Sequence, residues 1–351
     1  MGLGGVSLGM AEGDQEWLFG GPPGEGVVVA ATHDPGDLSL ADMLPAGVRL
    51  GTSSWSFPGW RGLVYDGNPK PRDLARRGLG AYSAHPAFRT VGIDRAFYDA
   101  VDASIFAEMA AQVPTHFRFL LKANQQVVRP TVNDRGDTHG RTSLATQPNP
   151  LFLDIDFAID RVIGPAAAGL GRACGPILFQ FPPMNLDPSG PLRGPDAFLD
   201  RLAEFLLALP RGPLYAVEIR NPDLLTARYA GILRAARVAH CLTVHPTMPP
   251  LARQLGAVGE GGGDATVIRW NLHAGTNYAA ASARYAPFNR LVDPDPRTRA
   301  AVADLVAAAV RAARPVYVIA NNKAEGSAPL TITALAHAVV ARLQGTPPLP
   351  R

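Results

Sequence analysis

The chain has 351 residues, of which 47% are hydrophobic and 18% are charged. This length and composition allow one large core, or one large α/β domain with an appendage. The 33 Lys and Arg residues exceed the 30 Asp and Glu residues only slightly and are scattered along the chain. An ordinary solvated surface is therefore favoured over a nucleic-acid-binding face.

The cysteines and the N-terminal sequence indicate the cellular compartment in which the protein is expected. Cys174 and Cys241 lie beside or within predicted strands, and neither belongs to a CxxC pair. Reduced core thiols of this kind are typical of a reducing compartment. The N-terminus lacks a basic segment followed by an apolar run, and no apolar run is long enough to span a bilayer. We therefore expect a cytoplasmic protein with no membrane partner; the oligomeric state is not indicated.

Residues 1–46 are rich in Gly, with Pro and acidic residues interspersed, and their one apolar run is Val27–Ala31. This composition predicts a partly disordered, flexible extension, in which Val27–Ala31 could add a strand. We expect the folded domain to cover residues 47–344 and a short tail to cover residues 345–351.

From Val48 onward, short strand-forming runs alternate with segments of helical periodicity. This alternation predicts a parallel sheet covered by helices, and eight units fit the size of a closed (β/α)8 TIM-type barrel. Periodicity does not distinguish a closed from an open sheet, so an open doubly wound sheet is the alternative. The runs are Val48–Trp55, Thr90–Phe97, Arg118–Ala123, Ile177–Phe181, Leu214–Arg220, His240–His245, Thr266–His273 and Pro315–Asn322.

Each predicted strand is apolar early and polar at its C-terminal end. In a barrel these ends meet at one face, where the active sites of this fold are found. The pattern predicts a functional cleft there. The polar residues are Asp94, Lys122, Gln180, Glu218, Arg220, His245, Arg269, Asn271, His273, Asn321 and Asn322.

Several motifs, in order along the chain, resemble those of the YecE-like family, a domain of unknown function numbered 72. The resemblance covers nearly everything from Val48 to Leu343 and implies a TIM-type barrel, but it implies no activity. Its motifs are Gly51–Trp60, Phe88–Val91 with Phe97-Tyr98, Gly175–Pro183, Tyr215–Pro222, and Val316–Asn322 with Gly326 and Ala328-Pro329.

Three positions depart from the family pattern. Gly92 stands where the family usually has Glu, Asn221 where it has His, and Ser54 where it has Gly. The missing second-strand carboxylate argues against a two-carboxylate mechanism that follows the family pattern. Asp94 lies two residues further on the same strand face and is the candidate substitute.

Glu218 is the leading candidate for a general acid or base, with Asp94 and His245 as further catalytic candidates. Burial at an apolar barrel mouth would raise the pKa of Glu218, whereas Arg220 or Lys122 would lower it. The alternative is a structural ion pair that fixes the barrel mouth.

An anionic substrate is indicated by Lys122, Arg220 and Arg269, whose cationic groups are predicted on one barrel face. Neutral side chains would add hydrogen bonds: Gln180, His273, Asn321 and Asn322. The turn of residues 321–328 precedes the last predicted helix and could hold a phosphate at the helix N-terminus; the alternative is a simple turn.

Trp55 and Trp60 belong to an aromatic first loop that could stack on a sugar ring or a base. A packed lid or an oligomer contact is the favoured alternative. The polar loop of residues 124–150, with Arg135, His139 and Arg141, is interpreted either as a mobile cover or as a disordered insertion.

We assign no metal ligands, and the sequence leaves the cofactor unknown. His245 and His273 with Glu218 and Asp94 give only a weak signal for a divalent metal. The leading hypothesis is a protein that binds or converts a small polar or anionic substrate by acid–base chemistry; a hydrolase, an isomerase and a lyase all stay open. The alternative is a non-catalytic nucleotide- or nucleic-acid-binding module, which is not favoured.

Overall fold

The computed structural model describes residues 27–133, 146–259, 262–273 and 275–345. Eight parallel strands form a closed barrel in the order β1-β10-β9-β8-β7-β6-β3-β2, and β1 pairs with both β10 and β2. Closure confirms the predicted barrel and excludes the open sheet. The strands are β1 (Val48–Thr52), β2 (Thr90–Ile93), β3 (Arg118–Lys122), β6 (Cys174–Gln180), β7 (Tyr215–Glu218), β8 (Ala239–Val244), β9 (Thr266–Trp270) and β10 (Val316–Ala320).

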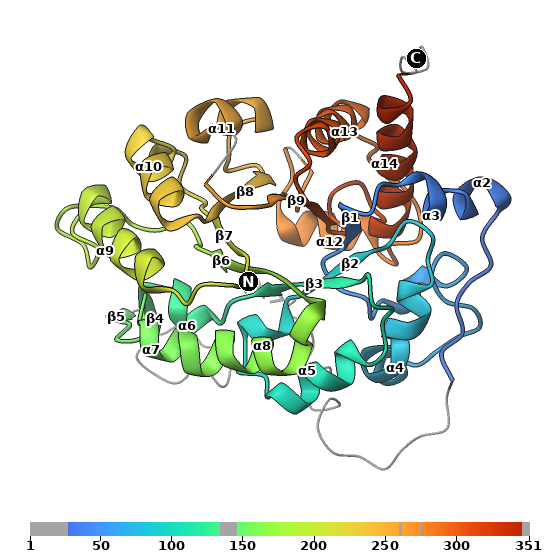
Figure 1. Cartoon of the computed structure of the whole chain (residues 1–351), viewed down its shortest axis with the longest axis horizontal. Coiled ribbons are helices and arrows are strands. Elements are labelled where there is room, and N and C mark those ends of the chain that lie inside the picture. Colours follow the sequence, from blue (N-terminus) through green and yellow to red (C-terminus); the bar gives the residue numbers. More distant parts are fainter. Residues whose placement is uncertain (1–26, 134–145, 260–261, 274, 346–351) are drawn as a thin grey trace, which may run out of the picture.

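Helices surround the barrel (Figure 1). The longer ones begin where the sequence offers a start signal, as at α13, where the Asp295 carboxylate accepts the Thr298 N–H at 2.9 Å. Their apolar stripes face the strands. The helices are α4 (Pro71–Ser83), α5 (Ala103–Ala110), α6 (Gln125–Val128), α7 (Ile155–Ala158), α8 (Gly164–Leu170), α9 (Pro195–Ala208), α10 (Ala227–Ala236), α11 (Leu251–Val258), α12 (Tyr278–Tyr285), α13 (Pro296–Arg311) and α14 (Ala328–Leu343).

Short helical turns complete the connections. They are η1 (Pro58–Trp60), η2 (Arg95–Phe97), the π-turn η3 (Ile159–Ile163), η4 (Gly171–Ala173) and η5 (Pro222–Leu224). Turn η2 matters for the site, because it directly follows the inward-facing Asp94 at the end of β2.

The barrel interior has an apolar lower layer and a polar upper layer. Seven buried side chains pack together as the lower layer: Leu120, Leu178, Ala216, Ala239, Cys241, Val267 and Ile319. Because strand side chains alternate, the residues two positions further along face the same interior. The lower layer therefore places polar side chains of β3, β6, β7, β8 and β9 at the barrel mouth.

Part of the predicted N-terminal extension is packed. Helices α2 (Pro35–Leu38) and α3 (Leu40–Met43) lie beside α14 (Figure 1), and the Leu40 and Leu44 side chains are buried. Arg89 donates hydrogen bonds to the Ala41 and Pro45 carbonyl oxygens at 2.7 and 2.8 Å. The run Val27–Ala31, which could have added a strand, forms only an isolated bridge from Ala30 to Tyr65.

The loop after β3 contains α6 and an antiparallel hairpin of β4 (Thr131–Asn133) and β5 (Thr146–Pro148). Arg135, His139 and Arg141 lie outside the described residues. Within the described ranges, no helix combines the length and apolar character needed to cross a membrane.

Candidate functional site at the barrel mouth

Glu218 lies at the end of β7 and is fully buried at the floor of the barrel mouth. Arg220 forms an ion pair with its Oε1, and the Arg269 Nη1 lies 2.7 Å from its Oε2. Thr243 Oγ1 donates to Oε1 at 3.3 Å, and the Cys241 thiol points to Oε2 at 3.8 Å. One carboxylate thus holds two guanidinium groups.

These contacts determine the protonation state of Glu218. Burial alone would raise its pKa, but the charges of Arg220 and Arg269 outweigh burial and lower the pKa to about 2. Glu218 is therefore ionised at neutral pH and has little tendency to accept a proton. The structural ion pair, which the sequence left as the alternative, fits this geometry better than the expected role as general acid or base.

Arg269 spans the mouth from β9 to the opposite wall. Its Nη1 donates to Gln180 Oε1 on β6 at 3.3 Å, and its Nη2 lies 3.9 Å from the Asp94 carboxylate after β2. The Nε atoms of Arg269 and Arg220 are buried and have no hydrogen-bond partner among the described residues. Each of the two guanidinium groups therefore keeps one buried N–H without a partner among the described residues.

Amide side chains extend this network around the mouth. Asn271 Nδ2 donates to Thr243 Oγ1 at 2.8 Å and lies 3.5 Å from Glu218 Oε1. Asn321 Nδ2 donates to Ser53 Oγ at 2.9 Å. Asp94, Gln180, Asn271 and Asn321 are all partly exposed, so they line the accessible surface above the buried floor.

Two lysine amines lie at the mouth, each against an aromatic ring. The Lys122 Nζ is 3.7 Å from the centre of the Phe97 ring, and the Lys323 Nζ is 3.9 Å from the centre of the Tyr278 ring. Burial lowers the pKa of each amine to about 8, although Asp94 opposes this shift for both. Lys323, in the turn before α14, was not among the predicted site residues.

His245 follows β8 at the mouth and is half-buried. Its Nδ1 accepts the Thr247 backbone N–H at 3.2 Å and lies 2.8 Å from Thr247 Oγ1. Burial, followed by the charge of Arg220, lowers its pKa to about 4. The ring is therefore neutral near pH 7 and carries its proton on Nε2, which makes it a hydrogen-bond donor. His273 is also half-buried, and its backbone N–H donates to the Lys323 carbonyl at 2.9 Å.

The sequence of this chain matches a known protein family. The family described as "Protein of unknown function DUF72" matches residues 49–351. The chain belongs to the DUF72 family.

Solved DUF72 structures share the fold. A DUF72 family protein from Enterococcus faecalis V583 is 17% identical with a TM-score of 0.57, and the match covers 83% of this chain and 95% of that chain. A DUF72 family protein from Thermotoga maritima MSB8 is 19% identical with a TM-score of 0.52, covering 83% and 98%. At these identities the likeness shows the fold alone. A search of curated proteins gave no match.

The aromatic motif of the DUF72 sequence lies in the core. Trp60 is fully buried and donates from Nε1 to Asn322 Oδ1 at 3.1 Å, while Trp55 is 6% exposed and donates to the Leu74 carbonyl at 3.0 Å. The expectation that Trp55, Trp60 and Asn322 contact substrate is corrected, because their polar groups already bind the protein. The packed alternative is the one found.

The turn before α14 is also covered. Asn322 Oδ1 accepts the Ala328 N–H at 2.9 Å, and the Glu325 carbonyl accepts the Val292 N–H at 2.7 Å. Glu325 is fully buried and is paired with Arg299. The expected phosphate site at this helix N-terminus is therefore wrong, because residues 322–329 are buried beneath the chain that enters α13.

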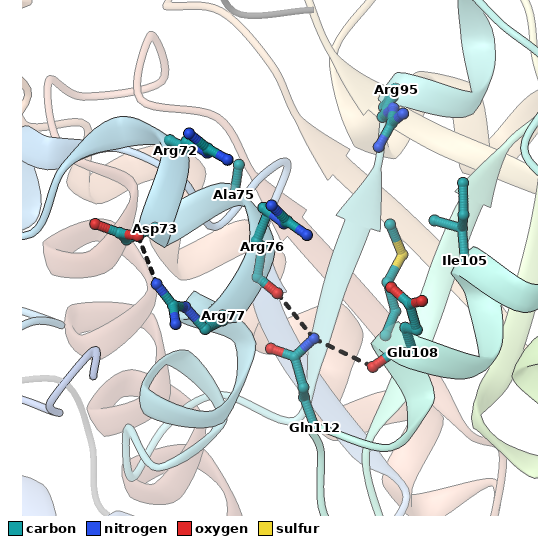
Figure 2. Close-up of a pocket in the computed structure, with 10 residues that line it drawn as sticks. Arg72, Asp73, Ala75, Arg76, Arg77, Arg95, Ile105, Glu108 and Gln112 are labelled. Atoms are coloured by element: carbon teal, nitrogen blue, oxygen red, sulfur yellow. Dashed lines mark hydrogen bonds and ion pairs between the residues drawn. The ribbon is translucent and has the colours of Figure 1, made fainter. Parts of the chain in front are cut away.

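A separate cavity of about 250 Å³ lies between α4 and α5, outside the barrel mouth (Figure 2). Its walls include Arg72, Arg76, Arg77 and Arg95, but Asp73 and Glu108 lie among them. Arg77 is paired with Asp73 at 2.7 Å, and Gln112 donates to the Arg76 and Glu108 carbonyls at 3.1 Å. Its carboxylates offset much of its positive charge.

The described residues contain no group of three His, Cys, Asp or Glu side chains placed to hold a metal ion. Residues that sequence reasoning did not single out include Gln254, which fixes β8 by bonding both the Thr243 N–H and its carbonyl at 3.0 and 2.8 Å. A lone Gln in the segment that forms α11 gave no signal of this role in the sequence.

Proposed function

We propose that the barrel mouth binds a small organic anion whose charged group contacts Arg220 and Arg269. The observation that carries this proposal is the convergence of two buried guanidinium groups on one buried carboxylate. With Lys122, three cationic side chains face two carboxylates, Glu218 and Asp94. An uncompensated positive charge at a partly desolvated site favours an anionic ligand.

Glu218 would act in this site as the residue that positions the arginines. Its low pKa makes it a poor proton-transfer group, so conversion of the ligand would rely on Asp94 and Lys122. Both are partly exposed at the mouth; Asp94 directly follows β2, and Lys122 ends the neighbouring strand β3. His245 would donate a hydrogen bond from Nε2, and Gln180 and Asn321 would orient the ligand.

The alternative of nucleotide or nucleic-acid binding has less support. It relied on stacking by the aromatic loop, and the Trp55 and Trp60 rings are buried. Binding through phosphates alone would weaken steeply with salt, with one counterion released for each contact. A small anion at a buried site would depend on salt much less.

The test is a calorimetric titration with inorganic phosphate, oxalate and lactate at constant ionic strength. Loss of one charge-assisted hydrogen bond costs about 1.5–3 kcal/mol, so Arg220→Gln should weaken binding about 10- to 100-fold. Arg237→Gln is the matched control, because Arg237 is an exposed arginine paired with Asp264 at 2.9 Å. Arg220→Lys, which keeps the charge, should recover part of the loss. Equal binding by the Arg220→Gln and control variants, with both folded by circular dichroism, would refute the proposal.

A further inference from the structure

The chain contains very few lysines. Of its 33 basic residues, 30 are arginines and only Lys70, Lys122 and Lys323 are lysines. A guanidinium stays protonated at any physiological pH, whereas an amine can lose its proton and become a nucleophile. Arginine therefore supplies almost all of the positive charge, and the three lysines supply the only side-chain amines of the sequence.

Two of the three lysines lie at the barrel mouth. Lys70 is exposed at the start of α4, but Lys122 is half-buried and Lys323 is 6% exposed. Lys323 is enclosed by Tyr278 and Phe288, whose ring centres are 3.9 and 5.6 Å from its Nζ. Of these two residues, Lys122 has the larger exposed fraction.

The barrel order places Lys122 beside the arginines. Strand β3 lies between β2 and β6, and Arg269 reaches a residue on each of these neighbours, Asp94 and Gln180. Lys122 is two residues beyond Leu120, which belongs to the inner apolar layer, so its side chain faces the same interior. A ligand anion on Arg269 would lie next to this amine.

The Lys122 amine forms no salt bridge with the described carboxylates near it. Among the described residues its Nζ makes no salt bridge or hydrogen bond, and its contact is the face of Phe97. Burial is the main cause that lowers its pKa to about 8; Arg269 and Arg220 add to the shift, while Asp94 and Glu218 oppose it. Desolvation next to cationic groups is a recognised way to activate a lysine nucleophile.

We propose that Lys122 forms an imine with a small aldehyde or ketone that carries a carboxylate or phosphate group. This inference rests on the proposed function, because Arg220 and Arg269 would hold the anionic group while the carbonyl carbon faces the amine. It narrows the ligand class from small anions to anionic carbonyl compounds.

The step balances without an oxidant or reductant. The Nζ lone pair attacks the carbonyl carbon, a C–N bond forms, and the C=O π electrons move to oxygen, which takes a proton to give a carbinolamine. The nitrogen releases its first proton, so the carbinolamine is neutral. The hydroxyl then takes up a second proton and leaves as water as the C–O bond breaks, and the nitrogen lone pair forms C=N as the second amine proton is released. Asp94, directly after the neighbouring strand β2, is placed to relay these protons.

The experiment is reductive trapping of the full-length protein with cyanoborohydride and each of pyruvate, glyoxylate and dihydroxyacetone phosphate. Intact-mass spectrometry detects the adduct, whose mass gain is that of the carbonyl compound minus water plus two hydrogens, and peptide mapping locates it. Acetone, which lacks the anion, and lactate, which lacks the carbonyl group, are matched ligand controls. Lys122→Arg and Lys323→Arg are matched protein variants, since each keeps the charge.

The expected result is a single adduct on Lys122, present in Lys323→Arg and absent from Lys122→Arg. Lactate should slow its formation, and acetone should react at least about 10-fold more slowly, because one charge-assisted contact is lost. The trapping rate should level off above about pH 8, whereas an ordinary lysine continues to gain reactivity toward about pH 10.4.

Three results would overturn the imine: no adduct with any of the three carbonyl compounds, an adduct on Lys70 or Lys323 in place of Lys122, or equal labelling of Lys122→Arg. If lactate still binds by calorimetry and loses affinity in Arg220→Gln, the proposed anion site stands without the imine. If lactate does not bind and trapping is indifferent to Arg220→Gln, both proposals fail.

Discussion

Replacing Glu218 by Gln removes the one carboxylate that holds two buried guanidinium groups, so its effect on stability should depend on pH. Near pH 7, loss of one member of a buried ion pair costs about 3–5 kcal/mol, because the partner charges stay buried. The pKa of Glu218 is lowered from 4.5 to about 2 in the folded protein. At about 1.4 kcal/mol for each pH unit, this lowering corresponds to about 3 kcal/mol of stability.

The sign follows from the direction of the shift. A carboxyl group with a depressed folded-state pKa contributes its full stability above its unfolded pKa of about 4.5, and loses it as the pH falls toward about 2. The wild-type protein should therefore lose about 3 kcal/mol more than Glu218→Gln between about pH 6 and about pH 2. The gap between the two unfolding free energies should close in acid, whereas other carboxyl groups affect both proteins alike.

The assay is urea unfolding of both proteins at several pH values, followed by circular dichroism. Asp264→Asn is the control, because Asp264 is an exposed carboxylate paired with Arg237 at 2.9 Å, and surface pairs contribute about 0–1 kcal/mol. A wild-type-to-Glu218→Gln gap that stays constant across the pH range would show that Glu218 is not ionised by the arginines, and the reasoning about the mouth would fail.

Three further predictions concern residues around the mouth. Trp60→Phe removes the hydrogen bond from Trp60 to Asn322. The free energy of unfolding in urea should fall by about 1–2 kcal/mol, and the affinity for lactate should not change. A loss of lactate affinity at unchanged stability would show instead that Trp60 belongs to the binding site. Arg299→Gln leaves the buried Glu325 carboxylate without its ion-pair partner and should lower the free energy of unfolding by about 3–5 kcal/mol. The control Arg237→Gln, at an exposed ion pair, should lower it by less than about 1 kcal/mol, and similar losses in the two variants would contradict this prediction. The NMR signals of His245 should titrate near pH 4, and a midpoint near 6.5 would refute a desolvated ring.

The positions of the strands followed well from the sequence, because period and length are local properties, whereas closure of the sheet was decided by the structure. Each of the eight runs overlaps a barrel strand, and residues such as Gln180, Glu218 and Arg269 do converge at the mouth. The alternation of side chains on each strand was sufficient to predict which face they share.

The ionisation and the burial of each site residue could not be predicted from the sequence, because they depend on contacts between segments that are far apart along the chain. Glu218 and Arg269 are 51 positions apart, and their pairing decides that the carboxyl group is ionised. Trp60 and Asn322 are 262 positions apart, and their hydrogen bond turns two expected ligand-binding residues into structural ones. The packing of residues 27–46 against α14 was likewise hidden by a composition that is typical of a flexible extension.

The apolar lower layer of the barrel has a consequence for how molecules enter and leave. Leu120, Leu178, Val267 and Ile319, with three smaller neighbours, fill the interior below Glu218 with buried side chains. Any molecule that reaches Glu218 must therefore enter and leave on the mouth side of the barrel. Only the charged end of a long ligand would contact the arginines near Glu218, and the rest of the ligand would extend past Asp94 and Asn321 into solvent.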